Sequence, residues 1–127
     1  MRVLFAAPDR DLLTAYKRLL NADGFDTDTA FDGTQVVRKL SEERYELLII
    51  MSDIPRIPIE QIVRSSTAKG IPVIEMVIGE KGTDPVPEGK SARMKMPLPF
   101  TPAELSEGIR KITGVPEEAE KAGVSYE

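Results

Sequence analysis

The sequence predicts a doubly wound α/β domain, in which helices cover both faces of a parallel sheet. Two observations support this prediction. Short apolar runs alternate with amphipathic stretches along the chain, a pattern typical of β-α-β units with right-handed crossovers. The run at residues 45–51 is apolar enough to be buried on both of its faces. Because 127 residues suffice for one core, we expect one domain over residues 1–114 and a C-terminal tail or linker over 115–127.

The first predicted unit is a strand followed by a helix. Residues 3–7 form a continuous apolar run, which is closed by Pro8 and Asp9. Asp9 is a suitable N-cap for a helix over residues 10–22, because its side chain can accept a hydrogen bond from the first turn. The apolar residues expected on one face of that helix are Leu12, Leu13, Tyr16, Leu19 and Leu20.

An edge strand, a second helix and the central strand are predicted next. Residues 25–30 are short and alternate in polarity, which suits a strand that is half open to water. A turn at residues 31–33 leads into a helix with its own apolar face. The apolar strand at 45–51 follows and is expected at the centre of the sheet.

The second half of the chain predicts a third helix over about residues 59–69, a strand over 72–78 and a short strand around 92–96. The last helix is the best marked. Thr101 as N-cap and Glu104 three residues later form a capping box, and apolar residues recur at helical spacing after them.

Residues 79–90 lie between the last two predicted strands and are expected to form a loop with at most one short turn. This segment, "GEKGTDPVPEGK", contains three glycines and two prolines. Both residue types oppose a continuous helix. A helix at this point of the fold is therefore predicted to be missing or reduced.

The composition excludes several classes of function. With no Cys and no His, the chain lacks thiolates and imidazoles, together with the metal sites and acid-base catalysts built from them. Its formal net charge of -4 disfavours nonspecific binding to nucleic acid or anionic lipid. No apolar run approaches the roughly 20 residues that a membrane span needs. We therefore expect a cytoplasmic domain that is not an enzyme and binds no cofactor, metal, nucleic acid or membrane.

Four segments resemble the receiver domains of bacterial response regulators. "TAFDGTQVVRKL" (29–40) is similar to the family's second strand, Asp-Gly turn and second helix, and "YELLIIM" (45–51) to its third strand. "PVIEMV" (72–77) is similar to the fourth strand, and "PFTPAEL" (99–105) to the Pro-Phe pair and last helix. The resemblance implies a three-layer flavodoxin-like fold with a five-stranded parallel sheet of order 2-1-3-4-5, and a role in two-component signal transduction or a phosphorelay.

The same resemblance shows that the phosphorylation site of the family is degenerate here. The phosphoacceptor aspartate at the end of the third strand falls on Met51, and the acidic pair that binds Mg²⁺ falls on Ala7 and Pro8. The family's Ser or Thr after the fourth strand falls on Val77, and its Lys before Pro-Phe falls on Leu98. All five positions depart from the pattern together.

These replacements remove the chemistry that phosphorylation needs. Mg²⁺ requires hard oxygen ligands, which a methyl group, a proline ring and a thioether do not supply. A phosphoryl group would also lose its charge-assisted hydrogen bonds. We expect Met51, Val77, Leu98 and Ala7 to pack against one another as an apolar cluster, with Met51 filling space in the core.

Two alternatives stay open. Asp53, two residues after Met51, could form a displaced acidic site with Asp9 and accept phosphate or metal, although Asp9 as a helix cap and Asp53 as a turn residue are the plainer interpretations. In the second alternative, the chain is a small-ligand or flavin-type binding module that uses the crevice at the end of the sheet. Against it, the loop "APDRD" carries an acid where flavin-binding relatives of this architecture cradle phosphate.

Glu75 is a charge inside an otherwise apolar strand and requires a partner if it is buried. Lys95, at the position of the family's switch aromatic, is the expected partner in a buried ion pair. Arg93 is the alternative cation, and exposure of Glu75 at an open sheet margin is the third interpretation. The resemblance also implies that the Leu98–Pro99 peptide bond is cis.

The sequence is thus identified as a pseudo-receiver, expected to work by binding a signalling protein without being phosphorylated. The expected contact surface is the remodelled segment 78–98 together with the last helix. A homodimer through this surface is one form that such binding could take.

Overall fold

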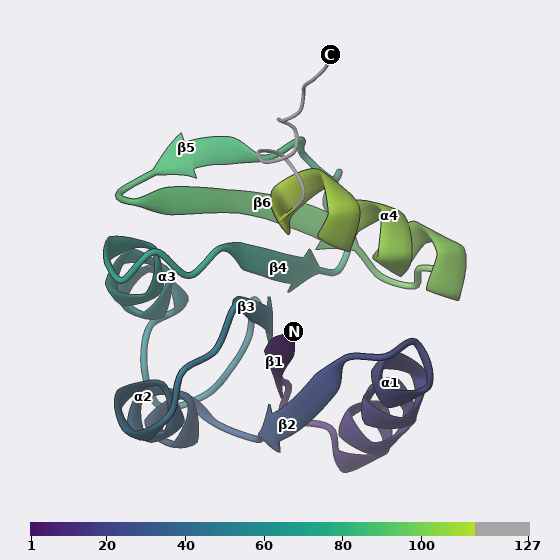
Figure 1. Ribbon diagram of the computed structural model, residues 1–127, viewed down its shortest axis with the longest axis horizontal. Coiled ribbons are helices and arrows are strands. Elements are labelled where there is room, and N and C mark those ends of the chain that lie inside the picture. Colours follow the sequence, from purple (N-terminus) through teal and green to yellow (C-terminus); the bar gives the residue numbers. More distant parts are fainter. Residues whose placement is uncertain (114–127) are drawn as a thin grey trace.

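One sheet runs through the molecule, with helices on both of its faces (Figure 1). The computed structural model describes residues 1–113, so the tail expected over 115–127 lies outside the described residues. The strands are β1 (Arg2–Ala6), β2 (Asp26–Ala30), β3 (Leu47–Met51), β4 (Val73–Val77), β5 (Val86–Glu88) and β6 (Ser91–Pro97). The helices are α1 (Arg10–Ala22), α2 (Gly33–Glu42), α3 (Ile59–Ala68) and α4 (Pro102–Thr113).

The strand order of the sheet confirms the predicted fold class. Over the described residues the order is β2-β1-β3-β4-β6-β5, and every neighbouring pair is parallel except β5 and β6. The first five positions are the predicted order 2-1-3-4-5, with β6 as the fifth strand. Helices α1 and α4 cover one face, and α2 and α3 cover the other (Figure 1). None of these helices is long and apolar enough to cross a membrane.

The segment 79–90 corrects one prediction. It contains no helix, as expected, but it is not all loop, because β5 pairs antiparallel with β6. Gly89, at φ +56°, forms part of the tight connection between the two strands. Pro87 is tolerated in β5 because an edge strand needs hydrogen bonds on one side only. The glycines and prolines that oppose a helix are therefore compatible with a hairpin.

The core is divided by the sheet into two clusters, which follow from strand alternation. In β3, Leu47, Ile49 and Met51 face α1 and α4, whereas Leu48 and Ile50 face α2 and α3. All five residues are buried, so the prediction of a central strand buried on both faces is confirmed. Burial of this kind is the main stabilising contribution to such a domain.

Side-chain caps fix the starts of two helices as the sequence predicts. Asp9 accepts hydrogen bonds from the backbone N–H groups of Asp11 and Leu12 at 2.9 and 3.3 Å. The capping box at α4 is complete, because Thr101 Oγ1 accepts from the Glu104 N–H at 3.1 Å and Glu104 Oε1 accepts from the Thr101 N–H at 2.7 Å. These caps fix where the loops after β1 and β6 end, at the carboxyl edge of the sheet.

Candidate functional site

The candidate site lies where β1, β3, β4 and β6 end, at the carboxyl edge of the sheet, where ligands of such folds bind. The backbone holds this edge together: the Leu98 N–H donates to the Val77 carbonyl at 2.8 Å, and the Ala7 N–H donates to the Ala30 carbonyl at 3.1 Å. The Leu98–Pro99 bond is cis, which confirms the expectation from the family. The five degenerate positions are therefore brought to one edge.

Three of the five positions, Ala7, Met51 and Leu98, are occupied by side chains that pack together. Met51 is only 6% exposed and shares a hydrophobic cluster with Ala7, while Leu98 is half-buried and packs against the same cluster. Val77 is fully buried but outside that cluster, so the prediction that it packs against Met51, Ala7 and Leu98 is wrong. Met51 pairs in register with Met76, so alternation turns the next residue, Val77, toward the other face of the sheet. Pro8 is exposed at the rim.

The donor groups at this edge do not fit Mg²⁺. A methyl group at Ala7, a ring at Pro8 and a thioether at Met51 supply no hard oxygen ligand. Among residues 1–113, no group of three His, Cys, Asp or Glu side chains is placed so that it could hold a metal ion. We derive no metal-dependent step for this site.

Asp9 and Asp53 follow β1 and β3 at this edge and have the local roles of a helix cap and a turn residue. Asp9 is exposed and its carboxylate is engaged as the cap of α1. Asp53 is exposed in the turn that follows β3. The carboxylate of Asp9 already accepts from the N–H groups of the first turn of α1, which argues against a phosphate at this helix N-terminus. The helix geometry thus gives no support to a flavin-type phosphate site.

The structure corrects the predicted ion pair between Glu75 and Lys95. Glu75 is 5% exposed, and its carboxylate accepts from Arg93 Nη2 at 3.2 Å. Lys95 instead donates to Glu80 at 3.1 Å. The alternative partner, Arg93, is therefore the right one, and exposure of Glu75 to solvent is wrong.

Arg93 is favoured because its guanidinium can serve several carboxylates at once. It binds Glu60 of α3 at 2.9 Å and Glu88 of β5 at 3.3 Å in addition to Glu75. Hydrogen bonding to Glu60 raises the pKa of Arg93, and the same bond lowers the pKa of Glu60. We call Arg93, Glu60, Glu75 and Glu88 the Arg93 cluster.

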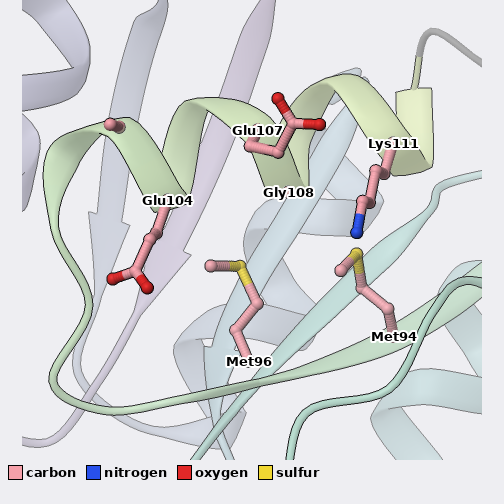
Figure 2. A pocket seen from close by; sticks show the side chains of 7 residues that line it. Met94, Met96, Glu104, Glu107, Gly108 and Lys111 are labelled. Atoms are coloured by element: carbon pink, nitrogen blue, oxygen red, sulfur yellow. The ribbon is translucent and has the colours of Figure 1, made fainter.

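An open pocket of about 360 Å³ lies between β6 and α4 (Figure 2). Met94 and Met96 point from β6 toward α4, while Glu104, Glu107 and Lys111 extend from the helix (Figure 2). This pocket lies within the surface that the sequence predicts for partner contact, but the pocket itself was not predicted. The sequence signal that could have indicated this pocket is Gly108, a glycine inside an amphipathic helix.

Gly108 allows the close approach of α4 to β6. A Cβ atom at this position would stand 2.5 Å from Met96 Sδ, which is closer than side-chain atoms pack. Glycine usually weakens a helix by about 1 kcal/mol relative to alanine. The close packing of Met96 against α4 therefore explains why a glycine is present at this position.

Among the comparisons with known proteins, the one with solved structures bears on the fold. No family model and no curated protein matches the sequence. Among solved structures, the chain is similar to a response regulator receiver protein from Sinorhizobium medicae, with a TM-score of 0.76 and 16% identity over 91% of this chain and 95% of that one. It is also similar to the chemotaxis response regulator CheY4 of Vibrio cholerae, with a TM-score of 0.72 and 19% identity over 87% and 97%.

A third similar structure carries the metal that the present residues do not fit. It is the receiver domain of a sensor histidine kinase from Pseudomonas aeruginosa, solved with a magnesium ion coordinated in its active site cleft. Its TM-score is 0.73, with 18% identity over 89% of this chain and 97% of that one. The chain therefore has the fold of a receiver domain, at a sequence identity below 20% to each of these three structures.

Proposed function

We propose that this chain is a receiver domain of a response regulator that works without phosphorylation and acts in signal transduction by binding a partner protein. The observation that carries the proposal is Met51, which ends the central strand and is buried with Ala7 in an apolar cluster. A thioether in that place can neither accept a phosphoryl group nor bind a hard cation. The proposed domain is a cytoplasmic binding module with no catalytic activity.

The chemistry of the neighbouring positions supports the same proposal. Phosphoryl groups on proteins are held by cations and by hydrogen-bond donors. Val77 and Leu98 offer neither, and Val77 is fully buried. A phosphoryl group here would have to displace packed apolar side chains without gaining a charged contact.

The proposed contact surface is the segment 78–98 together with α4. Two apolar side chains are exposed within it, Ile78 at 68% and Val86 at 48%. The methionine pocket between β6 and α4 adds an apolar hollow with charged groups at its rim (Figure 2). Met94 and Met96, which line this hollow, are themselves only 5% and 7% exposed. A signalling protein is the proposed partner, and a second copy of this chain is one candidate for it.

The first experiment asks whether the domain accepts phosphate. The protein is incubated with acetyl phosphate and Mg²⁺, and its intact mass is measured beside that of a receiver domain that retains its acceptor aspartate. We expect the control to gain a phosphoryl group and this chain to remain unmodified. A phosphoryl adduct on this chain would overturn the proposal.

The alternative function is that of an atypical phosphoaccepting receiver. Asp53 is its candidate acceptor, because it is exposed and lies two residues after the end of β3. The same incubation includes the Asp53→Asn variant. An adduct on the original chain that this variant lacks would establish the alternative. Peptide mapping of the adduct would identify the modified residue independently.

The second experiment addresses the contact surface. Proteins captured by the immobilised domain are quantified for the original chain and for an Ile78→Ser/Val86→Ser variant, with Val37→Ser as the control because Val37 is exposed on α2. We expect the double variant to lose a partner that the control retains. Equal capture by all three proteins would reject this surface.

A further inference from the structure

A second open pocket, of about 550 Å³, lies between α1 and β2. It adjoins the opposite end of the sheet from β5 and so is separate from the surface proposed above (Figure 1). Arg10, Lys17 and Arg18 of α1 line it, and Thr29 and Phe31 line it at the carboxyl end of β2. We call this the α1–β2 groove.

The α1–β2 groove gathers three cationic side chains that come from one helix. Arg10, Lys17 and Arg18 make no ion pair with any of residues 1–113. By contrast, Arg2 and Arg93 each bind three carboxylates. A chain with a net charge of -4 thus presents three cations together without internal partners. Such a local concentration of charge attracts anionic groups.

The backbone of β2 is available for pairing along this groove. The Asp26 N–H donates to the Met1 carbonyl and the Ala30 carbonyl accepts from the Ala7 N–H, so the backbone groups of the even-numbered residues point toward β1. Alternation then turns the backbone groups of Thr27 and Thr29 outward. The Asn21 side chain occupies the Thr27 N–H at 3.1 Å, and no other described strand pairs with this side of β2 at Thr29.

Phe31 completes the groove with an apolar contact. It follows β2 directly, and its side chain is exposed although it is a large aromatic residue. Aromatic side chains with one open face contribute strongly to interfaces. The groove therefore combines cations on one wall, an unpaired strand segment on the other and an aromatic side chain at one end.

We propose that the α1–β2 groove binds an acidic segment of a partner protein in extended conformation along β2. The three cations would pair with its carboxylates, the Thr29 backbone would pair with its backbone, and Phe31 would contact an apolar side chain. A nucleic acid fits less well, because the molecule as a whole is acidic and the cations are confined to one helix. This proposal does not depend on the state of Met51 or on the methionine pocket.

The test measures binding of a fluorescein-labelled peptide of alternating glutamate and valine by fluorescence anisotropy. We expect the Lys17→Gln/Arg18→Gln variant to bind at least about tenfold more weakly than the original chain, the equivalent of about 1.4 kcal/mol. The control is Arg38→Gln/Lys39→Gln, which removes the same charge from exposed positions of α2. Circular dichroism verifies that both variants remain folded.

Further probes separate the parts of the proposal. A peptide with glutamine in place of glutamate is expected to bind weakly. The acidic peptide N-methylated at every residue is expected to bind weakly as well, since it has no backbone N–H to donate to a strand. A chain ending at residue 114 is measured as well, because the acidic residues after it are potential competitors. Equal weakening by both double variants, equal binding of the N-methylated peptide, or stronger binding of a labelled DNA oligonucleotide would overturn the proposal.

Discussion

The carboxylate of Glu75 lies 3.2 Å from the guanidinium of Arg93, and not against Lys95, which is its register partner on β6. Through this contact Arg93 joins β4 to α3 and β5, because it also binds Glu60 and Glu88. The Arg93 cluster thus lies on the face of β4 and β6 that is turned toward α3.

Removal of Arg93 should destabilise the domain strongly. In the Arg93→Ala variant Glu75 remains buried without a cation, which typically costs about 3–5 kcal/mol. The free energy of unfolding, measured by urea denaturation, is expected to fall by about that amount. In Lys95→Ala the lost contact with Glu80 is exposed, so the expected change is below about 1 kcal/mol.

The double variant Arg93→Met/Glu75→Met distinguishes a pairing effect from a general packing effect. If the loss in Arg93→Ala comes from an unpaired charge, replacing both partners by apolar residues should restore most of the stability. A double variant as unstable as Arg93→Ala would show that the guanidinium is needed for another reason.

The Arg93 cluster also predicts a pH dependence. The pKa of Glu60 is lowered by its hydrogen bond to Arg93, so the folded state favours the charged carboxylate. The stabilisation is complete above the ordinary glutamate pKa of 4.5 and is lost as the pH falls through the lower value of the folded state. Unfolding measured across this acidic range should show a shallower loss of stability in Glu60→Gln than in the original chain. Identical slopes would contradict the prediction.

Thr27 offers a stabilising substitution. Its side chain is 2% exposed, and its hydroxyl finds no hydrogen-bond partner among the described residues. A buried polar group without a hydrogen-bond partner typically costs about 1–3 kcal/mol. Thr27→Val removes this group and keeps a β-branched side chain, which suits a strand. Thermal unfolding should therefore occur at a higher temperature in Thr27→Val. The half-buried Thr29 serves as the control, since Thr29→Val should leave the midpoint nearly unchanged.

Gly108 and Met96 are expected to be energetically coupled. Alone, Gly108→Ala places a methyl group against Met96 Sδ, which offsets the gain of about 1 kcal/mol in helix propensity. In a Met96→Ala background the same substitution should stabilise the protein by about 0.5–1 kcal/mol. Chemical denaturation of the four proteins in this double-mutant cycle gives the coupling. Independent effects at the two positions would rule out the contact as the reason for the glycine.

Restoring the acceptor aspartate should not restore metal binding. In Met51→Asp a carboxyl group enters the apolar cluster beside Ala7, where burial strongly disfavours its charged form. Even the neutral form, without a hydrogen-bond partner, is expected to cost about 2–7 kcal/mol. Because the other ligands are absent, Mg²⁺ should not raise the melting temperature of this variant. Met51→Leu, which keeps the volume and polarity, should cost less than about 1.5 kcal/mol. A stabilising response to Mg²⁺ in Met51→Asp would contradict the closure of this edge by packing.

Much of the fold could be predicted from the sequence, because local patterns determine it. Continuous apolar runs marked the inner strands, and the side-chain caps at Asp9 and Thr101 marked two helix starts. The strand β5 was missed because prolines and glycines indicate a loop equally well. Only its pairing with β6 makes it a strand.

The candidate site was less predictable, because its contacts join distant segments. Glu75 was expected to be paired, but the choice of Arg93 depends on Glu60 and Glu88, which come from other elements. The orientation of Val77 depends on the register between β3 and β4. The α1–β2 groove was not anticipated, since Arg10, Lys17 and Arg18 read as an ordinary solvated helix face.

The two margins of the sheet differ in what they offer to another polypeptide. Pro85 precedes β5 and Pro87 lies within it, so this margin has few amide hydrogens to donate. Endless side-by-side addition of identical copies, as in a fibril, requires that both margins accept a neighbour. Because the prolines oppose strand addition at the β5 margin, association through β2 stops at a single added segment. Binding of a segment at β2 therefore does not lead to aggregation.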